Sequence, residues 1–331
     1  MKNRIVTGDR PTGPLHLGHY VGSLKNRIKL QNEGYEIFNI IADFQVLTDR
    51  LETEDVEKNI KALVLDYLSI GINPKKTHIF VQSKVPQLSE LFVYLSMLVS
   101  VSRAGQNPTV KEETQATGGG KMSLGMFSMG VSQSADILAL NANLIPVGED
   151  QLPHIEQTRD VAKTFNHKFE SIFVEPKALL SDVPRLMGLD ADQKMSKSRN
   201  NAIFLTDTEE EVVKKIKRAT TDSERTIIYD KEKRPALANL ILMYSLFSET
   251  DIKDIEKKYE GKGYKEFKEG LALVVNNFLN PIRERRKEFE KDDDLVQRIL
   301  KEGTEKTIEE AEKTMKLVRK ALKYDYSKLG F

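Results

Sequence analysis

One stretch near the N-terminus decides the fold: Arg4-Ile5-Val6-Thr7, followed by Gly8-Asp9-Arg10-Pro11-Thr12-Gly13-Pro14 and then by His16-Leu17-Gly18-His19. The first part predicts a strand and the second a turn. The third opens a helix with apolar residues at helical spacing, namely Leu17, Tyr20, Val21, Leu24 and Ile28. A helix that starts just beyond a strand presents unpaired backbone N–H groups and a positive dipole end, which suit a phosphate group. The stretch therefore favours an α/β fold that binds a nucleotide.

The chemistry of this first motif depends on one glycine and two histidines. Gly18 has no side chain, so an adenine or a ribose can pack against its backbone. His16 and His19 are three residues apart and can project to one side, where imidazolium or neutral N–H donors would stabilise phosphorus as pyrophosphate leaves. Two other interpretations stay open. The histidines could satisfy the backbone at the helix start, or begin a metal site, although no third or fourth ligand is evident.

A second motif, Lys194-Met195-Ser196-Lys197-Ser198, lies in a polar loop between an apolar stretch and a charged helical tail. Lysine is a mobile point charge, and two ammonium groups on one loop suit a phosphate that gains charge in the transition state. The alternative is an ordinary solvated loop, because lysine-rich loops are common. Lys121-Met122-Ser123 begins in the same way, but Leu124 stands where the second lysine would be.

Composition and charge narrow the class of protein. The 331 residues suffice for one large core, or for a nucleotide-binding domain and a smaller helical one. The net charge of +1 provides no global attraction to nucleic acid, so RNA contacts must come from local patches. The absence of cysteine excludes disulfides and thiolate metal sites, and no apolar run approaches the ~20 residues of a membrane helix. With no signal-peptide pattern, we expect a cytoplasmic protein without a membrane segment.

The first 180 residues alternate short apolar runs with helical patterns, which is typical of a parallel α/β sheet. After the first strand, further strands are predicted at 36–41, 78–81 and 144–147. Helices are predicted to end near Gly34, to run from about Val56 to Gly71, and to run from about Pro86 to Ser102.

Beyond Thr206 the strand signals disappear, and helical patterns cover 209–218, 236–247, 264–288 and 294–324. The sequence therefore predicts an α/β protein with a Rossmann-type parallel-sheet nucleotide-binding domain and a C-terminal all-helical domain. We place the first domain at residues 1–205 and the helical domain at 206–290. A C-terminal helix at 291–331 is expected to pack back on the first domain.

The two motifs and the helical tail together resemble the class I aminoacyl-tRNA synthetases. More narrowly, residues 10–22 resemble the opening of the bacterial tryptophanyl-tRNA synthetases. Pro146-Val147-Gly148-Glu149-Asp150-Gln151, with its continuation to Asp160, is similar to the same family, and so are 221–224 and 259–264. The likeness covers nearly the whole chain.

By this resemblance, the catalytic residues would be His16, His19, Lys194 and Lys197. The residues that would contact ATP are Arg10, Pro11, Thr12, Gly18, His19, Lys111, Gly148, Glu149, Asp150, Gln151, Leu186, Lys194, Met195, Ser196, Lys197 and Ser198. Leu186 would lie against the adenine, and the lysine motif would close over the phosphates. Gly148 to Gln151 also lie where a strand's carboxyl end meets a helix, the usual ligand crevice of a parallel sheet. A plain helix cap by Asp150 is the alternative.

Asp136 carries the choice of amino acid. By the resemblance it would anchor the substrate indole, whose N–H is a donor only and matches a carboxylate acceptor. Gln133, one helical turn earlier, would join it in the tryptophan pocket with Gln45 and Gly8. One branch of the family has methionine in place of Gln133, and a glutamine three residues before an aspartate also resembles the tyrosine enzymes. A tyrosine hydroxyl can donate to the same carboxylate, and a solvated aspartate is a further alternative.

The wider context favours tryptophan, because the run from Gly148 to Asp160 is closer to that family. Only about 60 residues separate Val81 from Leu144, too few for an editing domain with its connecting helices. Enzymes for small aliphatic substrates need editing, since one methylene provides only ~1–3 kcal/mol of discrimination. This count argues against the aliphatic enzymes and leaves tyrosine open.

The resemblance implies ATP with Mg²⁺ as cofactor, L-tryptophan and tRNA(Trp) as substrates, and a homodimer. Residues 1–205 would be the catalytic domain and 206–290 the anticodon-binding domain. Basic residues expected to contact the anticodon are Lys214, Lys215, Lys217, Arg218, Arg283, Arg285 and Arg286, although each could equally belong to a solvated helix face. The alternatives are a tyrosyl-tRNA synthetase, a small adenylyltransferase, and an inactive RNA-binding paralogue. The last would be expected to have lost His16, Gly18, Lys194 or Lys197.

Overall fold

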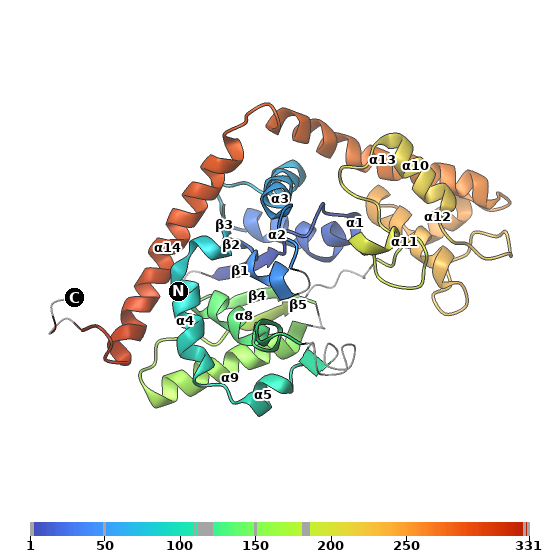
Figure 1. Ribbon diagram of the computed structural model, residues 1–331. Helices are drawn as coiled ribbons and strands as arrows, with labels where there is room; N and C mark the ends of the chain where they lie inside the picture. The colour runs from blue at the N-terminus through green and yellow to red at the C-terminus, as the bar shows by residue number, and fades with distance from the viewer. Residues whose placement is uncertain are drawn as a thin grey trace.

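A five-stranded parallel sheet forms the centre of the N-terminal half in the computed structural model (Figure 1). The structure describes residues 3–48, 51–108, 110–111, 122–148, 151–180, 186–326 and 329, with Ser198 described by its backbone alone. The strands are β1 (Arg4–Asp9), β2 (Glu36–Ile41), β3 (Thr77–Val81), β4 (Leu144–Val147) and β5 (Lys177–Leu180). Their order in the sheet is β3-β2-β1-β4-β5. The predicted α/β fold with a Rossmann-type parallel sheet is confirmed.

The sheet changes its winding direction between β1 and β4, and this creates a place for a ligand. β1 and β2 pair over six residues, from Arg4 with Glu36 to Asp9 with Ile41. In the described part of the chain, β1 pairs with β4 at Ile5 and Leu144 alone. The carboxyl ends of these two strands are therefore not joined, and ligands of open parallel sheets bind in such a crevice.

Helices and short turns cover the sheet. The helices are α1 (Leu17–His19), α2 (Lys25–Asn32), α3 (Val56–Ile70), α4 (Pro86–Ser96), α5 (Val101–Gly105), α7 (Leu124–Phe127), α8 (Met129–Leu138) and α9 (Leu152–Lys168). A π-helix, η1 (Tyr20–Leu24), joins α1 to α2, and the short 3₁₀ turns are η2 (Phe44–Thr48), η3 (Gln82–Lys84) and η5 (Lys197–Arg199).

Two details of the predicted α/β part are wrong. The helix expected from Pro86 to Ser102 ends at Ser96, because Ser100 adopts extended backbone angles and its side chain caps α5 by accepting the Arg103 N–H at 3.1 Å. The sequence analysis also missed β5. This strand has four residues at the edge of the sheet, and its side chains are exposed or half-buried, so it has little apolar pattern.

The C-terminal half is helical. Its helices are α10 (Glu209–Arg218), α11 (Pro235–Ser248), α12 (Ile252–Lys258), α13 (Tyr264–Phe289) and α14 (Leu295–Ala321). Thr208 and Glu211 form a capping box that fixes the start of α10. The sequence analysis missed α12, which has seven residues and is capped by Asp251. No helix in the described ranges is both long and apolar enough to cross a membrane.

The last helix, α14, runs back from the helical bundle along β3 and α4 (Figure 1). Its backbone lies directly on the edge strand, because a Cβ added at Gly303 would be 1.9 Å from the carbonyl oxygen of Ile79. At the far end, Arg319 forms ion pairs with Glu90 of α4 and with Glu312, the latter at 2.7 Å. The edge of β3 is thus covered by a helix.

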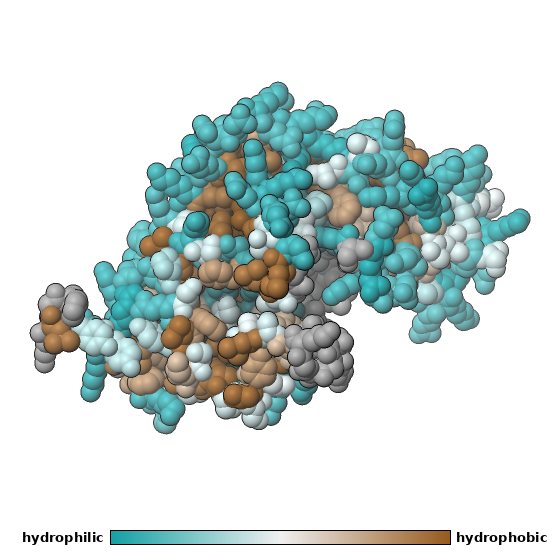
Figure 2. Space-filling view, in the orientation of Figure 1, coloured by the Kyte–Doolittle hydropathy of each residue, from teal (hydrophilic) through white to brown (hydrophobic). Residues whose placement is uncertain are grey.

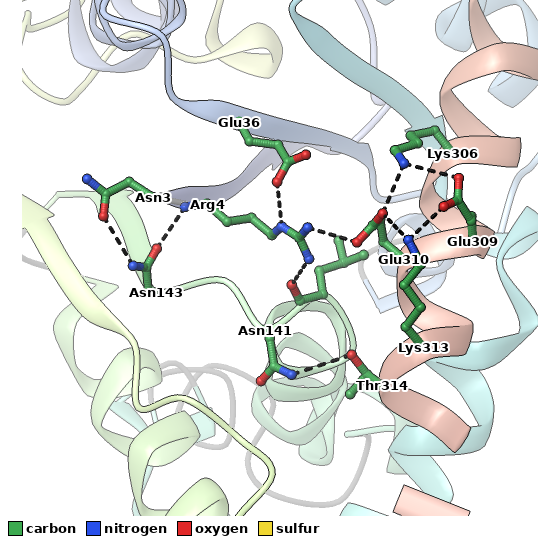
Figure 3. A network of polar contacts seen from close by, with 11 residues as sticks. Asn3, Arg4, Glu36, Asn141, Asn143, Lys306, Glu309, Glu310, Lys313 and Thr314 are labelled. Atoms are coloured by element: carbon green, nitrogen blue, oxygen red, sulfur yellow. Dashed lines mark hydrogen bonds and ion pairs between the residues drawn. The ribbon is translucent and has the colours of Figure 1, made fainter. Parts of the chain in front are cut away.

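A polar network ties α14 to the centre of the sheet (Figure 3). The Arg4 guanidinium donates to Glu36 at 2.9 Å and to Glu310 of α14 at 2.8 Å. Lys306 and Lys313 also contact Glu310, at 2.9 Å and 2.7 Å. Burial opposes ionisation of Glu310, but the three cations outweigh it and lower the pKa of that carboxyl to about 2.

Candidate active site

One cavity of about 770 Å³ lies at the carboxyl ends of β1 and β4 and receives both motifs. The predicted residues that line it are Gly8, Arg10, Thr12, His16, Gly18, His19, Gln45, Gln133, Asp136, Gly148, Gln151, Leu186, Lys194, Met195, Ser196 and Lys197. Pro11 and Lys111 are not among the lining residues. Glu149 and Asp150 lie outside the described residues, and so does the side chain of Ser198. Most of the predicted site residues therefore face one space.

Backbone pairing brings the two motifs together across about 180 residues of sequence. The Leu17 N–H donates to the Ile203 carbonyl at 2.9 Å, and the Leu205 N–H donates to the Leu15 carbonyl at 2.9 Å. His16 and Phe204 form an antiparallel bridge between these two bonds. The segment after the lysine motif thus lies directly beside the segment that opens the histidine motif.

The two histidines of the first motif are neutral donors near pH 7. Burial is the main cause, and nearby Lys197 a smaller one, of a pKa lowered to about 3 for His16 and to about 4 for His19. The His16 backbone N–H donates to Nδ1 of His19 at 3.2 Å, so neutral His19 carries its proton on Nε2. The ring centroids are 3.7 Å apart. Of the two protonation states considered for this motif, the structure favours neutral imidazole.

Gly18 keeps the two motifs in contact. A Cβ at this position would lie 3.0 Å from the His16 ring and 3.2 Å from Cβ of Met195. Both distances are shorter than ordinary carbon contacts, so a side chain at position 18 would require the His16 ring and Met195 to shift slightly.

The lysine motif is held over the turn that follows β1. Nζ of Lys197 donates to the Gly13 carbonyl at 2.8 Å and to Oγ1 of Thr12 at 3.3 Å. The Ser196 N–H donates to the buried side chain of Asn201 at 2.9 Å. The motif is therefore an ordered part of the cavity wall, and the alternative of an ordinary solvated loop does not describe it.

A residue of the helical half holds the base of the same loop. Asn239 of α11 accepts the Met187 N–H at 3.0 Å and donates to the carbonyls of Met187 and Gly188 at 3.1 Å and 3.3 Å. Asn239 is buried. The position of the lysine motif therefore depends on the helical bundle as well as on the sheet.

Asp136, on α8, lines the same cavity as the lysines. Its side chain is buried, and both of its oxygens accept from Nε2 of Gln82, at 3.0 Å and 2.8 Å. Burial raises the pKa of Asp136 to about 7, Gln82 acts to lower it, and Asp43 acts to raise it. The alternative of a solvated aspartate is wrong. The cavity around it has apolar walls from Val6, Ile40, Ile145 and Val147.

A second carboxylate of the cavity wall was not predicted from the sequence, the half-buried Asp9 at the end of β1. Asp9 accepts from Arg27 at 2.7 Å and from the hydroxyl of Tyr67 at 2.6 Å. Arg27 also donates to the Gly8 carbonyl at 3.1 Å and to Asn39 at 3.0 Å. Burial opposes ionisation of Asp9, but Arg27 and His19 outweigh it and lower the pKa of Asp9 to about 2. The feature of the sequence that could have identified Asp9 is its position as a polar residue at the carboxyl end of a buried strand.

The expected anticodon contacts of three arginines are not supported by their partners. Arg283 donates to the Asp207 carbonyl at 2.7 Å, and Arg285 to the Ser69 carbonyl at 2.6 Å. Arg286 pairs with Asp66 of α3. Arg285 and Arg286 join α13 to α3 in the N-terminal half, whereas Arg283 bonds to the segment just before α10. By contrast, Lys214, Lys217 and Arg218 on α10 are exposed.

A second, smaller cavity of about 340 Å³ lies behind Asp136. Asp136 and Gln45 line both cavities, whereas Gln82 lines the second one. Its walls include the apolar side chains Phe44, Leu47, Leu88, Phe92 and Met129. The pocket carboxylate is therefore the partition between two spaces.

The fold and the site define a class of protein. A crevice at the switch point of a parallel sheet binds nucleotides, and here neutral histidine donors and lysines face that crevice together. This combination is that of an α/β enzyme of the class I synthetase type.

Comparison with known proteins identifies the family. Residues 1–280 match the family model described as tRNA synthetases class I (W and Y). The chain is 44% identical to the tryptophan–tRNA ligase of Streptococcus mutans, over 97% of this chain and 98% of that relative. The tryptophanyl-tRNA synthetase of Mycoplasma pneumoniae has a similar structure, with a TM-score of 0.87 and 26% identity over 99% of each chain. That of Campylobacter jejuni, in complex with ADP and tryptophan, has a TM-score of 0.83 and 30% identity over 99% of this chain and 100% of the other. The chain belongs to the class I tRNA synthetases of the W and Y group.

Proposed function

We propose that this enzyme activates L-tryptophan with ATP and transfers it to tRNA(Trp). The observation that carries the proposal is that Asp136 lies in the same cavity as the histidine and lysine motifs. A buried carboxylate among apolar walls matches a large flat ring with a single N–H donor. The relatives named tryptophan–tRNA ligase, at 44% identity over nearly the whole chain, support the same substrate.

In the proposed first step, a carboxylate oxygen of tryptophan attacks the α-phosphorus of ATP in line. The bond from that phosphorus to its bridging oxygen breaks, and pyrophosphate leaves with the electron pair. Neutral His16 and His19 would donate to phosphate oxygens, and Lys194 and Lys197 would balance the charge that develops as pyrophosphate departs. In the second step, a hydroxyl of the terminal adenosine of the tRNA attacks the acyl carbon, and AMP leaves.

The residues of the cavity fit an Mg²⁺ ion that enters with the nucleotide. Magnesium prefers oxygen ligands and is often held mainly by substrate phosphates and water. Among the described residues there is no group of three or more His, Asp or Glu that could enclose an ion, and the cavity carboxylate Asp9 is engaged by Arg27 and Tyr67. When bound, the ion would neutralise part of the triphosphate charge.

We assign the catalytic domain to residues 1–205 and the anticodon-binding domain to 206–290. Within the segment 291–331, helix α14 packs on the first of these through β3 and α4. The exposed residues Lys214, Lys217 and Arg218 on α10 are the remaining candidates for anticodon contacts. The proposed setting is the cytoplasm, which the cysteine-free sequence favours.

We further propose that the enzyme is a homodimer that pairs through the face around the second cavity. Apolar side chains gather over α4 and α8 in the space-filling view (Figure 2). At the cavity mouth Phe44 is 43% exposed and Leu47 is 48% exposed, and Met97 and Leu124 nearby are 78% and 79% exposed. Contiguous exposed apolar side chains mark protein interfaces. Sedimentation velocity of Leu47→Asp should show a monomer where the unchanged chain is a dimer.

The function is tested by pyrophosphate exchange into ATP with the purified chain and each of the twenty amino acids. We expect tryptophan to stimulate exchange. Stimulation by tyrosine and not by tryptophan would overturn the proposal, because a phenol hydroxyl can also donate to Asp136. The absence of exchange with any amino acid would favour an inactive RNA-binding protein.

A further inference from the structure

We propose that Gln82 is a positioning residue for substrate selection: it orients the Asp136 carboxylate and keeps it an acceptor for the ring N–H of the substrate. This inference rests on the proposed function and names a residue that acts on the substrate through another. Gln82 lies in η3, directly after the edge strand β3, and is 1% exposed.

The geometry of the Gln82–Asp136 pair fixes the carboxylate. Nε2 of Gln82 lies 3.0 Å from one oxygen of Asp136 and 2.8 Å from the other, so the amide approaches the carboxylate head-on. A carboxylate held through both oxygens cannot rotate about its own axis without losing a bond. Its remaining lone pairs are therefore presented to the cavity in a fixed direction.

The ionised form of Asp136 is stabilised by a neutral partner. No cationic side chain in the described part of the chain bonds to Asp136, and the acidic Asp43 precedes η2 nearby. His154 on α9 lines the same cavity and contacts the side chain of Asn107 at 3.2 Å. Gln82 is thus the neutral dipole that favours the charged form, against burial and Asp43.

The orientation of the Gln82 amide has an energetic cost. Oε1 of Gln82 is buried and has no hydrogen-bond partner among the described residues. An unsatisfied buried carbonyl is unfavourable. The bond to the Asp136 carboxylate therefore sets the orientation of the Gln82 amide, even though this orientation leaves Oε1 without a partner.

The test compares tryptophan with an analogue whose ring N–H is replaced by sulfur, 3-(3-benzothienyl)-L-alanine. The chain with Gln82 should prefer tryptophan in kcat/KM for exchange by about tenfold or more, because the analogue leaves a charged acceptor unpaired. In Gln82→Leu, tryptophan activation should fall by about tenfold or more while the analogue changes much less. The ratio of the two substrates should therefore collapse toward one.

A second variant keeps the test independent of folding. In Gln82→Glu, the introduced carboxyl and Asp136 would share one proton near neutral pH, so the introduced group donates as the amide did. Raising the pH from 6 to 8 removes that proton, and KM for tryptophan should rise. With Gln82 in place, KM should fall over the same range.

Gln87 provides a matched control. It is also a glutamine whose Nε2 donates to a carboxylate, Glu312 at 3.0 Å, and whose Oε1 is buried without a partner among the described residues. It lines neither cavity, so Gln87→Leu should leave the substrate ratio unchanged.

Two outcomes would overturn the inference. One is an unchanged preference for tryptophan over the sulfur analogue in Gln82→Leu. The other is a Gln82→Glu variant whose KM follows pH in the same direction as the unchanged chain. Failure of the proposed function is distinguishable from both, because it would show as stimulation of the unchanged chain by tyrosine and not by tryptophan.

Discussion

Two carboxylates in the wall of one cavity, the half-buried Asp9 and the buried Asp136, have opposite chemistry. Burial raises the pKa of both. Asp9 accepts from Arg27 and Tyr67, and its pKa falls to about 2, whereas Asp136 accepts from the neutral Gln82 and its pKa rises to about 7. Between these two acids, the cationic partner of Asp9 makes the difference in charge. One carboxylate is a permanent part of the scaffold, and the other can exchange a proton near neutral pH.

Removal of the Arg27 cation should have the largest effect on the contrast between Asp9 and Asp136. Arg27→Met leaves the half-buried Asp9 with no opposite charge, and we expect a loss of about 3 kcal/mol in the free energy of unfolding. Urea denaturation at pH 7.5 measures it. The double variant Arg27→Met/Asp9→Leu should recover part of the loss, and an equal loss in both variants would show that packing around Arg27, not its charge, is responsible.

Neutralising each acid should change stability in opposite directions. Asp9 has a folded pKa below that of the unfolded chain, so its ionisation stabilises the fold above about pH 4 and is lost as the pH falls through about 2. Asp136 has a raised folded pKa, so its ionisation weakens the fold as the pH rises to about 7. At pH 8, Asp9→Asn should therefore lose about 2 kcal/mol and Asp136→Asn should gain about 1–3 kcal/mol. Urea unfolding gives the sign, and a loss in both variants would contradict the contrast.

The proton of Asp136 should also control substrate affinity. If ionised Asp136 accepts the indole N–H, KM for tryptophan should fall about tenfold between pH 6 and pH 8, as the carboxyl titrates at about pH 7. KM for ATP, measured in the same exchange reactions, provides the control. Parallel changes in both KM values would assign the titration to another group.

The smallest expected effect on stability comes from a base of the cavity, His19. Burial lowers the pKa of His19 to about 4, so the folded chain keeps it neutral while the unfolded chain protonates below about pH 6.5. The contribution of His19 to stability should therefore fall by about 1 kcal/mol as the pH is lowered from 6.5 to 5.5. His19→Asn should remove this part of the decline in urea titrations, whereas the part that comes from His16 stays. A decline of equal slope in that variant would assign it to other groups.

Local patterns in the sequence predict the fold well where elements are long or fully buried. The central strands and the helices α3, α10, α13 and α14 lie within a few residues of their predicted bounds. The misses are short: β5 and α12 have four and seven residues, and the break after Ser96 depends on a single serine cap. Short elements such as these are determined by tertiary contacts or by a single capping side chain. Neither is visible in the hydrophobic periodicity of the sequence.

The residues of the site also fall into those that the sequence predicts and those that it does not. The histidine and lysine motifs and Asp136 can be found in the sequence because their residue types and spacing are distinctive. Gln82 and Arg27 cannot, because their roles depend on partners 54 and 18 residues away that only the folded sheet brings near. The protonation of the histidines depends on burial, which the motif by itself does not reveal.

The position of α14 has a consequence for the synthesis of the protein. The edge strand β3 is complete after residue 81, but its cover, with Gly303 lying on Ile79, is made more than 200 residues later. Since domains begin to fold from the N-terminus as the chain leaves the ribosome, the nascent sheet has a bare strand edge for most of translation. That edge is a template for pairing with other chains. Premature termination before α14 should therefore yield aggregated and not merely shortened protein.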